Sequence, residues 1–170
     1  MSGSRPIPLL LLVAAATACA VPQSASAPPP ATAEGFRSGD CNLVSDSDVD
    51  TAAGAGKFDK VVVGDAGCFW QENSMIGSFG AGMGISTWWY RGSNLDAERT
   101  LERKAGREIT EMSVDGNVGF RASDDNACSI YVAKGGDVIT WSIQTVNPGS
   151  LPPLCTVVGE LAQLSQDRVN

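Results

Sequence analysis

The sequence contains no histidine. Without histidine the chain cannot build a Ser-His-Asp triad or a Cys-His pair, and it lacks the most common metal ligand of proteins. No two of its cysteines stand in the Cys-x-x-Cys spacing that is typical of a zinc site. We therefore predict that the protein is not an enzyme and that it has no catalytic residues, no metal site and no cofactor.

The sequence also has fewer basic than acidic residues. The formal net charge is −7, whereas binding to nucleic acid requires a basic footprint on the surface. A globular face of this charge is equally unsuited to lie against anionic lipid. We therefore expect no nucleic-acid partner, and we expect any attachment to a membrane to run through a single residue.

The start of the chain lacks an apolar run of the roughly 20 residues that cross a bilayer. Arg5 is followed by an apolar run from Ile7 to Ala16, and Ala-Thr-Ala then stands directly before Cys19. This order is typical of a bacterial lipoprotein signal with a lipobox. We predict a signal peptide over residues 1–18 and attachment of acyl chains such as palmitate at Cys19. An ordinary secretory signal is the alternative, because its cleavage site also ends in small residues.

Residues 19–39 have almost no large apolar side chains and are rich in proline, serine, alanine and threonine. Such a segment cannot bury enough apolar surface to fold. Proline-rich chains extend by about 3.1 Å per residue, which gives this one a reach of roughly 60 Å. We predict a disordered tether that holds a globular domain, residues 40–170, at the extracytoplasmic face of the cell membrane.

The domain alternates short helical and strand patterns. Ser45 caps a short helix that stops at Gly54, Ser93 or Asn94 caps a polar helix that runs to about residue 105, and an apolar stripe marks a last helix over residues 154–168. Alternating or β-branched segments predict strands at 60–63, 67–70, 85–91, 109–114, 118–122, 127–133 and 138–145. The pattern predicts an α+β domain with an antiparallel sheet and flanking helices, the last of which covers the inner side of the sheet.

Five cysteines are present, and four remain when Cys19 carries lipid. An even number in an exported chain predicts two disulfides, and four cysteines allow three connectivities. We prefer Cys41–Cys68 and Cys128–Cys155, because Cys128 shares a strand side with apolar residues that the last helix should cover, and Cys155 stands beside the apolar stripe of that helix.

Trp88, Tyr90 and Arg91 belong to the most aromatic run of the chain. On a strand, Trp88 and Tyr90 point to one side and Trp89 points to the other. One aromatic side should be core, and the other is either covered by the polar helix or open as a ligand surface with Arg91 at its rim. We expect core packing at Trp88, so that Trp88→Ala would cost about 3–5 kcal/mol.

Several of these motifs together resemble a known family. They are Cys41-x-x-Val-Ser-Asp, Gly67-Cys68-Phe69-Trp70, Trp89-Tyr90-Arg91-Gly92-Ser93, the single cysteine of the Cys128 strand, and Pro-x-x-Cys155 before the last helix. The chain is similar to the actinobacterial cell-envelope lipoproteins typified by LprB and LprC, a family without an assigned function. The resemblance implies a membrane lipid anchor and a small α+β domain, similar to the Mog1/PsbP architecture. It supplies no catalytic residues.

Two functions are consistent with these observations. The first is a non-enzymatic protein-interaction or structural module of the envelope, and the second is a carrier or sensor of a small apolar or lipid ligand. A sealed core on both sides of the sheet would favour the first. A cavity beside Trp88 and Tyr90 would favour the second.

Overall fold

The computed structural model describes residues 40–54, 58–63, 67–72, 82–150 and 152–169. All of them belong to one compact unit, Thr32–Asn170. The predicted signal peptide, Cys19 and the tether lie outside the described residues.

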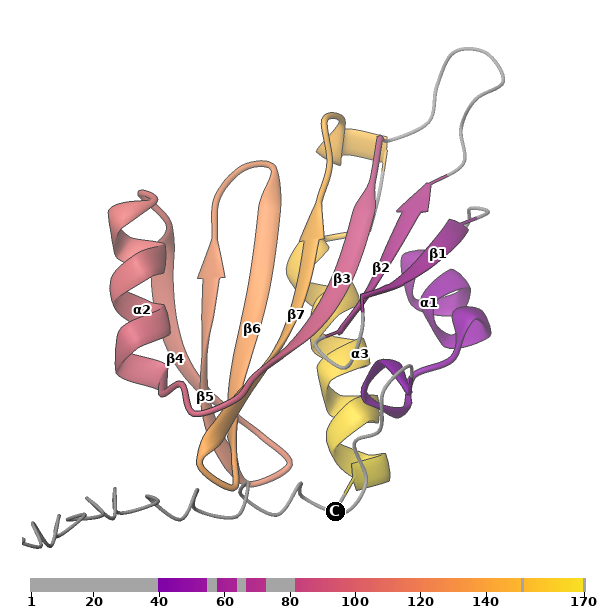
Figure 1. Cartoon of the computed structure of the whole chain (residues 1–170). Helices are drawn as coiled ribbons and strands as arrows, with labels where there is room; N and C mark the ends of the chain where they lie inside the picture. Colours follow the sequence, from indigo (N-terminus) through magenta and orange to yellow (C-terminus); the bar gives the residue numbers. More distant parts are fainter. Residues whose placement is uncertain (1–39, 55–57, 64–66, 73–81, 151, 170) are drawn as a thin grey trace, which may run out of the picture. The chain divides into compact units, whose positions relative to one another are not determined.

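The described residues form three α-helices, two short turns of 3₁₀ type and seven strands (Figure 1). In chain order the elements are η1 (Cys41–Leu43), α1 (Asp46–Ala53), β1 (Phe58–Val63), β2 (Gly67–Glu72), β3 (Gly84–Tyr90), α2 (Leu95–Lys104), β4 (Glu108–Val114), β5 (Asn117–Ser123), β6 (Ala127–Lys134), β7 (Asp137–Gln144), η2 (Pro148–Ser150) and α3 (Leu154–Val169). Each strand and helix predicted from the sequence coincides with one of these elements.

The seven strands form one sheet in the order β1-β2-β3-β7-β6-β5-β4, and every neighbouring pair is antiparallel. Helix α3 packs on β6 and β7 and also contacts α1, so these two helices cover the inner face of the sheet. Helix α2 packs on β4, β5 and β6 and contributes to a second apolar cluster, which belongs to the outer face. The predicted α+β class with an antiparallel sheet and flanking helices is confirmed.

The inner face carries the main core. Alternation along β7 points Ile139, Trp141 and Ile143 toward α3, and all three side chains are fully buried. The apolar stripe of α3 supplies Val157 and Leu161 to the same core. Full burial of an aliphatic side chain of this size contributes about 1.5–3 kcal/mol, so this contact is a main source of stability.

The stripe of α3 does not continue to Leu164, which is only half-buried. The buried positions of the last turns are instead Ser165 and Gln166. Both polar side chains have partners, because Ser165 Oγ donates to the carbonyl oxygen of Asn42 over 2.8 Å and Gln166 Oε1 accepts from Asn117 over 3.2 Å. Hydrogen bonds thus join the end of α3 to η1 through Ser165 and to the first residue of β5 through Gln166.

Two disulfides connect the helices to the sheet. Cys41 is bonded to Cys68, which joins η1 to β2, and Cys128 is bonded to Cys155, which joins β6 to α3. Both pairs have Cα atoms 5.3 Å apart, inside the usual range for a disulfide. Of the three connectivities that four cysteines allow, the preferred one is confirmed.

The first turn of the domain has an unusual backbone. Cys41, Asn42 and Leu43 have φ angles of 46°, 53° and 61°, which is the left-handed region. This conformation costs roughly 1–2 kcal/mol for each residue other than glycine, so surrounding contacts must hold it. The disulfide fixes Cys41, and the buried amide of Asn42 donates to Thr87 Oγ1 on β3.

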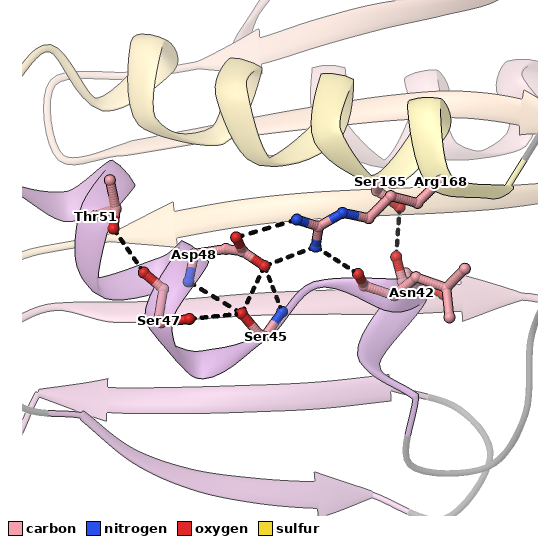
Figure 2. A network of polar contacts seen from close by, with 8 residues as sticks. Asn42, Ser45, Ser47, Asp48, Thr51, Ser165 and Arg168 are labelled. Atoms are coloured by element: carbon pink, nitrogen blue, oxygen red, sulfur yellow. Dashed lines mark hydrogen bonds and ion pairs between the residues drawn. The ribbon is translucent and has the colours of Figure 1, made fainter.

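Arg168 near the end of α3 completes this attachment (Figure 2). Its guanidinium donates to the carbonyl oxygen of Leu43 over 2.8 Å and to Asp48 over 2.7 Å. Asp48 also forms the capping box of α1 with Ser45, as the sequence pattern predicts for this helix start. The bond from Arg168, followed by that from Ser45, lowers the pKa of the Asp48 carboxyl well below its ordinary value. The last helix of the domain is thus joined to α1 by an ion pair and to η1 by a hydrogen bond to the carbonyl oxygen of Leu43.

Candidate ligand groove on the outer face of the sheet

The outer face of the sheet has a covered half and an open half. Helix α2 covers β4, β5 and β6, where the rings of Phe120 and Tyr131 stack with centroids 4.6 Å apart. The open half includes the outer positions of β1, where Val61 and Val63 are 55% and 42% exposed. The open half of the outer face therefore exposes apolar side-chain surface.

A groove of about 410 Å³ lies between the two halves. We call it the α2 groove. Its wall toward β3 carries Trp88 and Tyr90, both half-buried, and its opposite wall carries Leu101 of α2. Trp88 and Tyr90 share this face because they alternate with Trp89, which points into the inner core and is 6% exposed.

The floor of the α2 groove is a hydrogen-bonded polar network. The Tyr131 hydroxyl donates to Glu102, and Arg107 Nη1 lies 3.1 Å from the other carboxylate oxygen of Glu102. The same Nη1 donates to Ser129 Oγ over 3.0 Å, and the hydroxyls of Ser129 and Ser142 are 2.9 Å apart. Burial, followed by the bond to Glu102, raises the pKa of the Tyr131 phenol far above its ordinary value. The phenol therefore remains a hydrogen-bond donor at neutral pH.

A second hollow of about 260 Å³ continues along the open half. We call it the edge hollow. It is lined by Phe69 and Gln71 of β2, by Val146, and by Ser86, Ser142 and Gln144, the last three of which also line the α2 groove. Among the described residues that line the edge hollow, none is ionisable.

Two glycines determine how the aromatic rings lie on this face. A Cβ atom at Gly67 would lie 2.9 Å from Cε3 of Trp88, which is its register partner on β3. A Cβ atom at Gly84 would lie 3.0 Å from two ring carbons of Phe69. Each ring thus packs over a glycine on the neighbouring strand, and part of each ring is left exposed in a hollow.

Among the residues singled out from the sequence, Trp88 and Tyr90 come together in the α2 groove, and Arg91 does not. The Arg91 guanidinium carbon lies 4.3 Å from the centroid of the Trp89 ring, and Arg91 lines neither hollow. The guanidinium in the groove belongs to Arg107.

Sequence reasoning missed Glu102, Arg107 and Phe69. The one available signal was the i, i+4 spacing of Glu98 and Glu102, which places both on one side of a polar helix. It could not show that this side faces a sheet.

The described ranges contain neither a cluster of metal ligands nor a membrane-spanning helix. No group of three or more Cys, Asp or Glu side chains in these ranges is placed to hold a metal ion. No helix in the same ranges is both long enough and apolar enough to span a bilayer.

Curated relatives extend over most of the chain. A protein of Mycobacterium bovis, provisionally named lipoprotein LprB, is 30% identical over 146 residues, which cover 80% of this chain and 76% of the relative. Its counterpart in Mycobacterium tuberculosis is 30% identical over 147 residues with the same coverage, and that of Mycobacterium leprae is 24% identical over 131 residues, or 74% of this chain and 67% of the relative. No solved structure matches the chain, so the expected likeness to the Mog1/PsbP architecture stays a prediction.

The resemblance drawn from the cysteine and Trp-Tyr-Arg-Gly-Ser motifs is confirmed by these relatives. One family profile, described as a protein of unknown function (DUF3558), matches residues 13–168. The match extends over nearly the whole sequence, and the chain belongs to this DUF3558 family of proteins of unknown function.

Proposed function

We propose that the chain is a lipid-anchored, non-enzymatic binding module of the cell envelope, and that the groove on its outer sheet face holds a small ligand. The observation that carries this proposal is the α2 groove beside Trp88 and Tyr90. A sheet sealed on both faces would have favoured a purely structural role. A concave site with exposed aromatic surface and a few placed polar groups is typical of ligand binding.

The polar groups of the groove support binding rather than catalysis. Glu98 accepts from Ser93 Oγ, and Glu102 is held by Tyr131 and Arg107. A general acid or base must be able to exchange its proton with a substrate. These carboxylates are instead engaged within the protein, where they orient the floor of the groove.

The anchor proposal rests on Cys19 and on the relatives, which are named as lipoproteins. The two disulfides support export, because such bonds persist in oxidising compartments. Two or more acyl chains on one cysteine hold a protein at a bilayer stably, whereas one chain holds it only marginally. The domain would then stand on the extracytoplasmic face, with the membrane as its partner through Cys19.

Cys19→Ala tests the anchor. In the native host, the wild-type chain should partition into the detergent phase on phase separation, and Cys19→Ala should move to the aqueous phase because no lipid is attached. Ser24→Ala, in the predicted tether, is the matched control and should partition like the wild type. If Cys19→Ala remained in the detergent phase, lipid on Cys19 would not be the main attachment.

Trp88→Ala tests the groove. The full chain should be purified from the membranes of its own host and examined by native mass spectrometry for a bound small molecule. We expect the ligand to be lost in Trp88→Ala, with a loss of stability of only roughly 1–2 kcal/mol because the ring is half-buried. Arg91→Ala is the control and should keep the ligand. The groove would not be the binding site if Trp88→Ala retained the ligand.

A second candidate, binding of a protein partner, is favoured by the edge of the sheet. Strand β1 stands at the edge and exposes Val61, Val62 and Val63. An uncovered apolar edge strand can pair with a strand of another chain. In that case the same purification would yield a bound protein instead of a small molecule, and Val62→Lys would release it.

A further inference from the structure

The α2 groove and the edge hollow form one surface. They share Ser86, Ser142 and Gln144, and Ser86 is the register partner of Ser142. The shared residues lie on the neighbouring strands β3 and β7. We call the continuous surface the trough. The trough runs from Phe69 and Gln71 on β2, across β3 and β7, to Leu101 on α2.

Aromatic rings stand at two places along the trough. Phe69 is the register partner of Ser86, and Trp88 follows Ser86 by two residues on the same face. Two residues of strand correspond to about 7 Å. Both rings are backed by glycines, Gly84 and Gly67, so they lie over the sheet and offer surface to a ligand in the trough. This arrangement suits a chain of flat ring units.

The described residues that line the edge hollow beside Phe69, and continue toward Trp88, include uncharged hydrogen-bonding side chains. Ser86, Ser142, Gln71 and Gln144 contribute hydroxyls and amides to the edge hollow. Gln71 and Ser142 already bond within the protein, to the carbonyl oxygen of Met83 and to Ser129 Oγ. A hydrocarbon chain laid over the hollow would separate the remaining donors and acceptors of these side chains from water without new partners, which costs free energy. A ligand with hydroxyls would replace the lost water bonds. The trough therefore fits a polyhydroxylated ligand better than an acyl chain.

The charge of the residues that line the trough distinguishes between sugars and nucleic acids, both of which contain rings that could stack on Trp88 and Phe69. Nucleic acid also stacks on aromatic rings of a sheet face, but it requires basic side chains along its backbone. The described lining of the edge hollow has no ionisable residue, and that of the α2 groove has two carboxylates, Glu98 and Glu102, and one cation, Arg107. Phosphate-bearing and acidic ligands are therefore disfavoured.

We infer that the trough binds a neutral oligosaccharide, whose sugar rings pack on Trp88 and Phe69 while its hydroxyls bond to Ser86, Ser142 and Gln144. The apolar side of a sugar ring packs on an aromatic ring, and its hydroxyls match neutral donors and acceptors. The inference rests on the proposed function, since it names the ligand class of the same groove.

The test uses the full lipidated chain in a detergent without a sugar head group. The probes are maltohexaose, cellohexaose, xylohexaose and mannohexaose, titrated by calorimetry, with glucose 1-phosphate and palmitate as comparison ligands. At least one hexasaccharide should bind saturably, and its monosaccharide should bind more weakly by about tenfold or more, because it covers one ring instead of two. The comparison ligands should bind no better than the monosaccharide.

Trp88→Leu and Phe69→Leu keep an apolar cover over Gly67 and Gly84 and remove the aromatic rings. Each should weaken hexasaccharide binding by about tenfold or more, while a thermal melt shows that the variant remains folded. Arg91→Ala is the matched control and should bind like the wild type.

Three results would overturn the inference. The first is that no hexasaccharide binds up to about 10 mM. The second is a non-sugar molecule that co-purifies with the wild type and is lost in Trp88→Leu; the proposed groove function would then stand and only the ligand class would be wrong. The third is a dimer that Trp88→Leu converts to monomer, which would make a second copy of the chain the occupant.

Discussion

Trp141→Ala is expected to lower the free energy of unfolding by about 3–5 kcal/mol, as truncation of a buried tryptophan does. Trp141 lies in β7 between β3 and β6, and its side chain is fully buried on the inner face. Its ring stacks on that of Trp70, with centroids 5.9 Å apart and ring planes at 20°. Loss of the ring would leave a cavity under α3 that the surrounding strands can fill only partly. Urea unfolding with the disulfides intact measures the change.

Trp141→Phe is the matched control. Within the part of the chain that the structure describes, the Trp141 Nε1 has no hydrogen-bond partner. Replacement by phenylalanine keeps most of the ring and removes a buried N–H group whose burial is costly, so we expect a loss of only about 1–2 kcal/mol. Trp70→Phe should cost more than Trp141→Phe, because Trp70 Nε1 donates to Asp46 over 2.9 Å. Equal losses for the alanine and phenylalanine variants of Trp141 would contradict this account of the core.

The strands and the helices could be predicted because each depends on a local pattern. Period-two alternation along β7 identified its inner side, and the apolar stripe of α3 identified the helix that covers it. Those two faces must meet, which placed Cys128 beside Cys155 before their bond was seen. The capped start of α1 at Ser45 and its stop at Gly54 are equally local signals, and both are confirmed.

The candidate site could be predicted only in part because it depends on contacts between distant segments. Strand alternation placed Trp88 and Tyr90 on one side of β3. It could not show which side of the sheet α2 would cover. The expected core position of Trp88 differs from its half-buried place beside the groove, because α2 packs on β4, β5 and β6 and leaves this part of β3 open. Arg91 was expected at the rim because it is the cation next to the aromatic run, but it follows the end of β3 and its guanidinium lies over the Trp89 ring instead.

The left-handed conformation of the first turn, η1, could not be predicted for a related reason. Nothing in Cys41-Asn42-Leu43 favours three left-handed residues in a row. The conformation is imposed by partners far along the chain: Cys68, Thr87, Ser165 and Arg168. These partners cannot be identified from the residues next to the turn. The helix that follows could be predicted, because its capping residues lie within its own sequence.

Removal of either disulfide should lower the free energy of unfolding by about 3 kcal/mol. The two removals can be compared directly. Each joins cysteines separated by 27 residues, so the chain-entropy model assigns the two bonds the same effect on the unfolded state. The variants are Cys128→Ala with Cys155→Ala, and Cys41→Ala with Cys68→Ala, compared with the wild type by urea unfolding. A loss well below about 1 kcal/mol for either pair would contradict the expected contribution.

Any difference in the free energy of unfolding between the two variants would then come from the native state. The Cys128–Cys155 bond joins two elements, β6 and α3, that also pack through a large apolar core. The Cys41–Cys68 bond holds the left-handed turn, whose other described attachments include hydrogen bonds from Asn42, Ser165 and Arg168. Loss of Cys41–Cys68 should therefore also speed hydrogen exchange in α1, because its cap at Ser45 and Asp48 follows that turn directly. Loss of Cys128–Cys155 should leave exchange in α1 close to that of the wild type, since Arg168 and Ser165 would still hold the turn in place. Unchanged exchange in α1 after loss of Cys41–Cys68 would show that the hydrogen bonds alone fix the start of the domain.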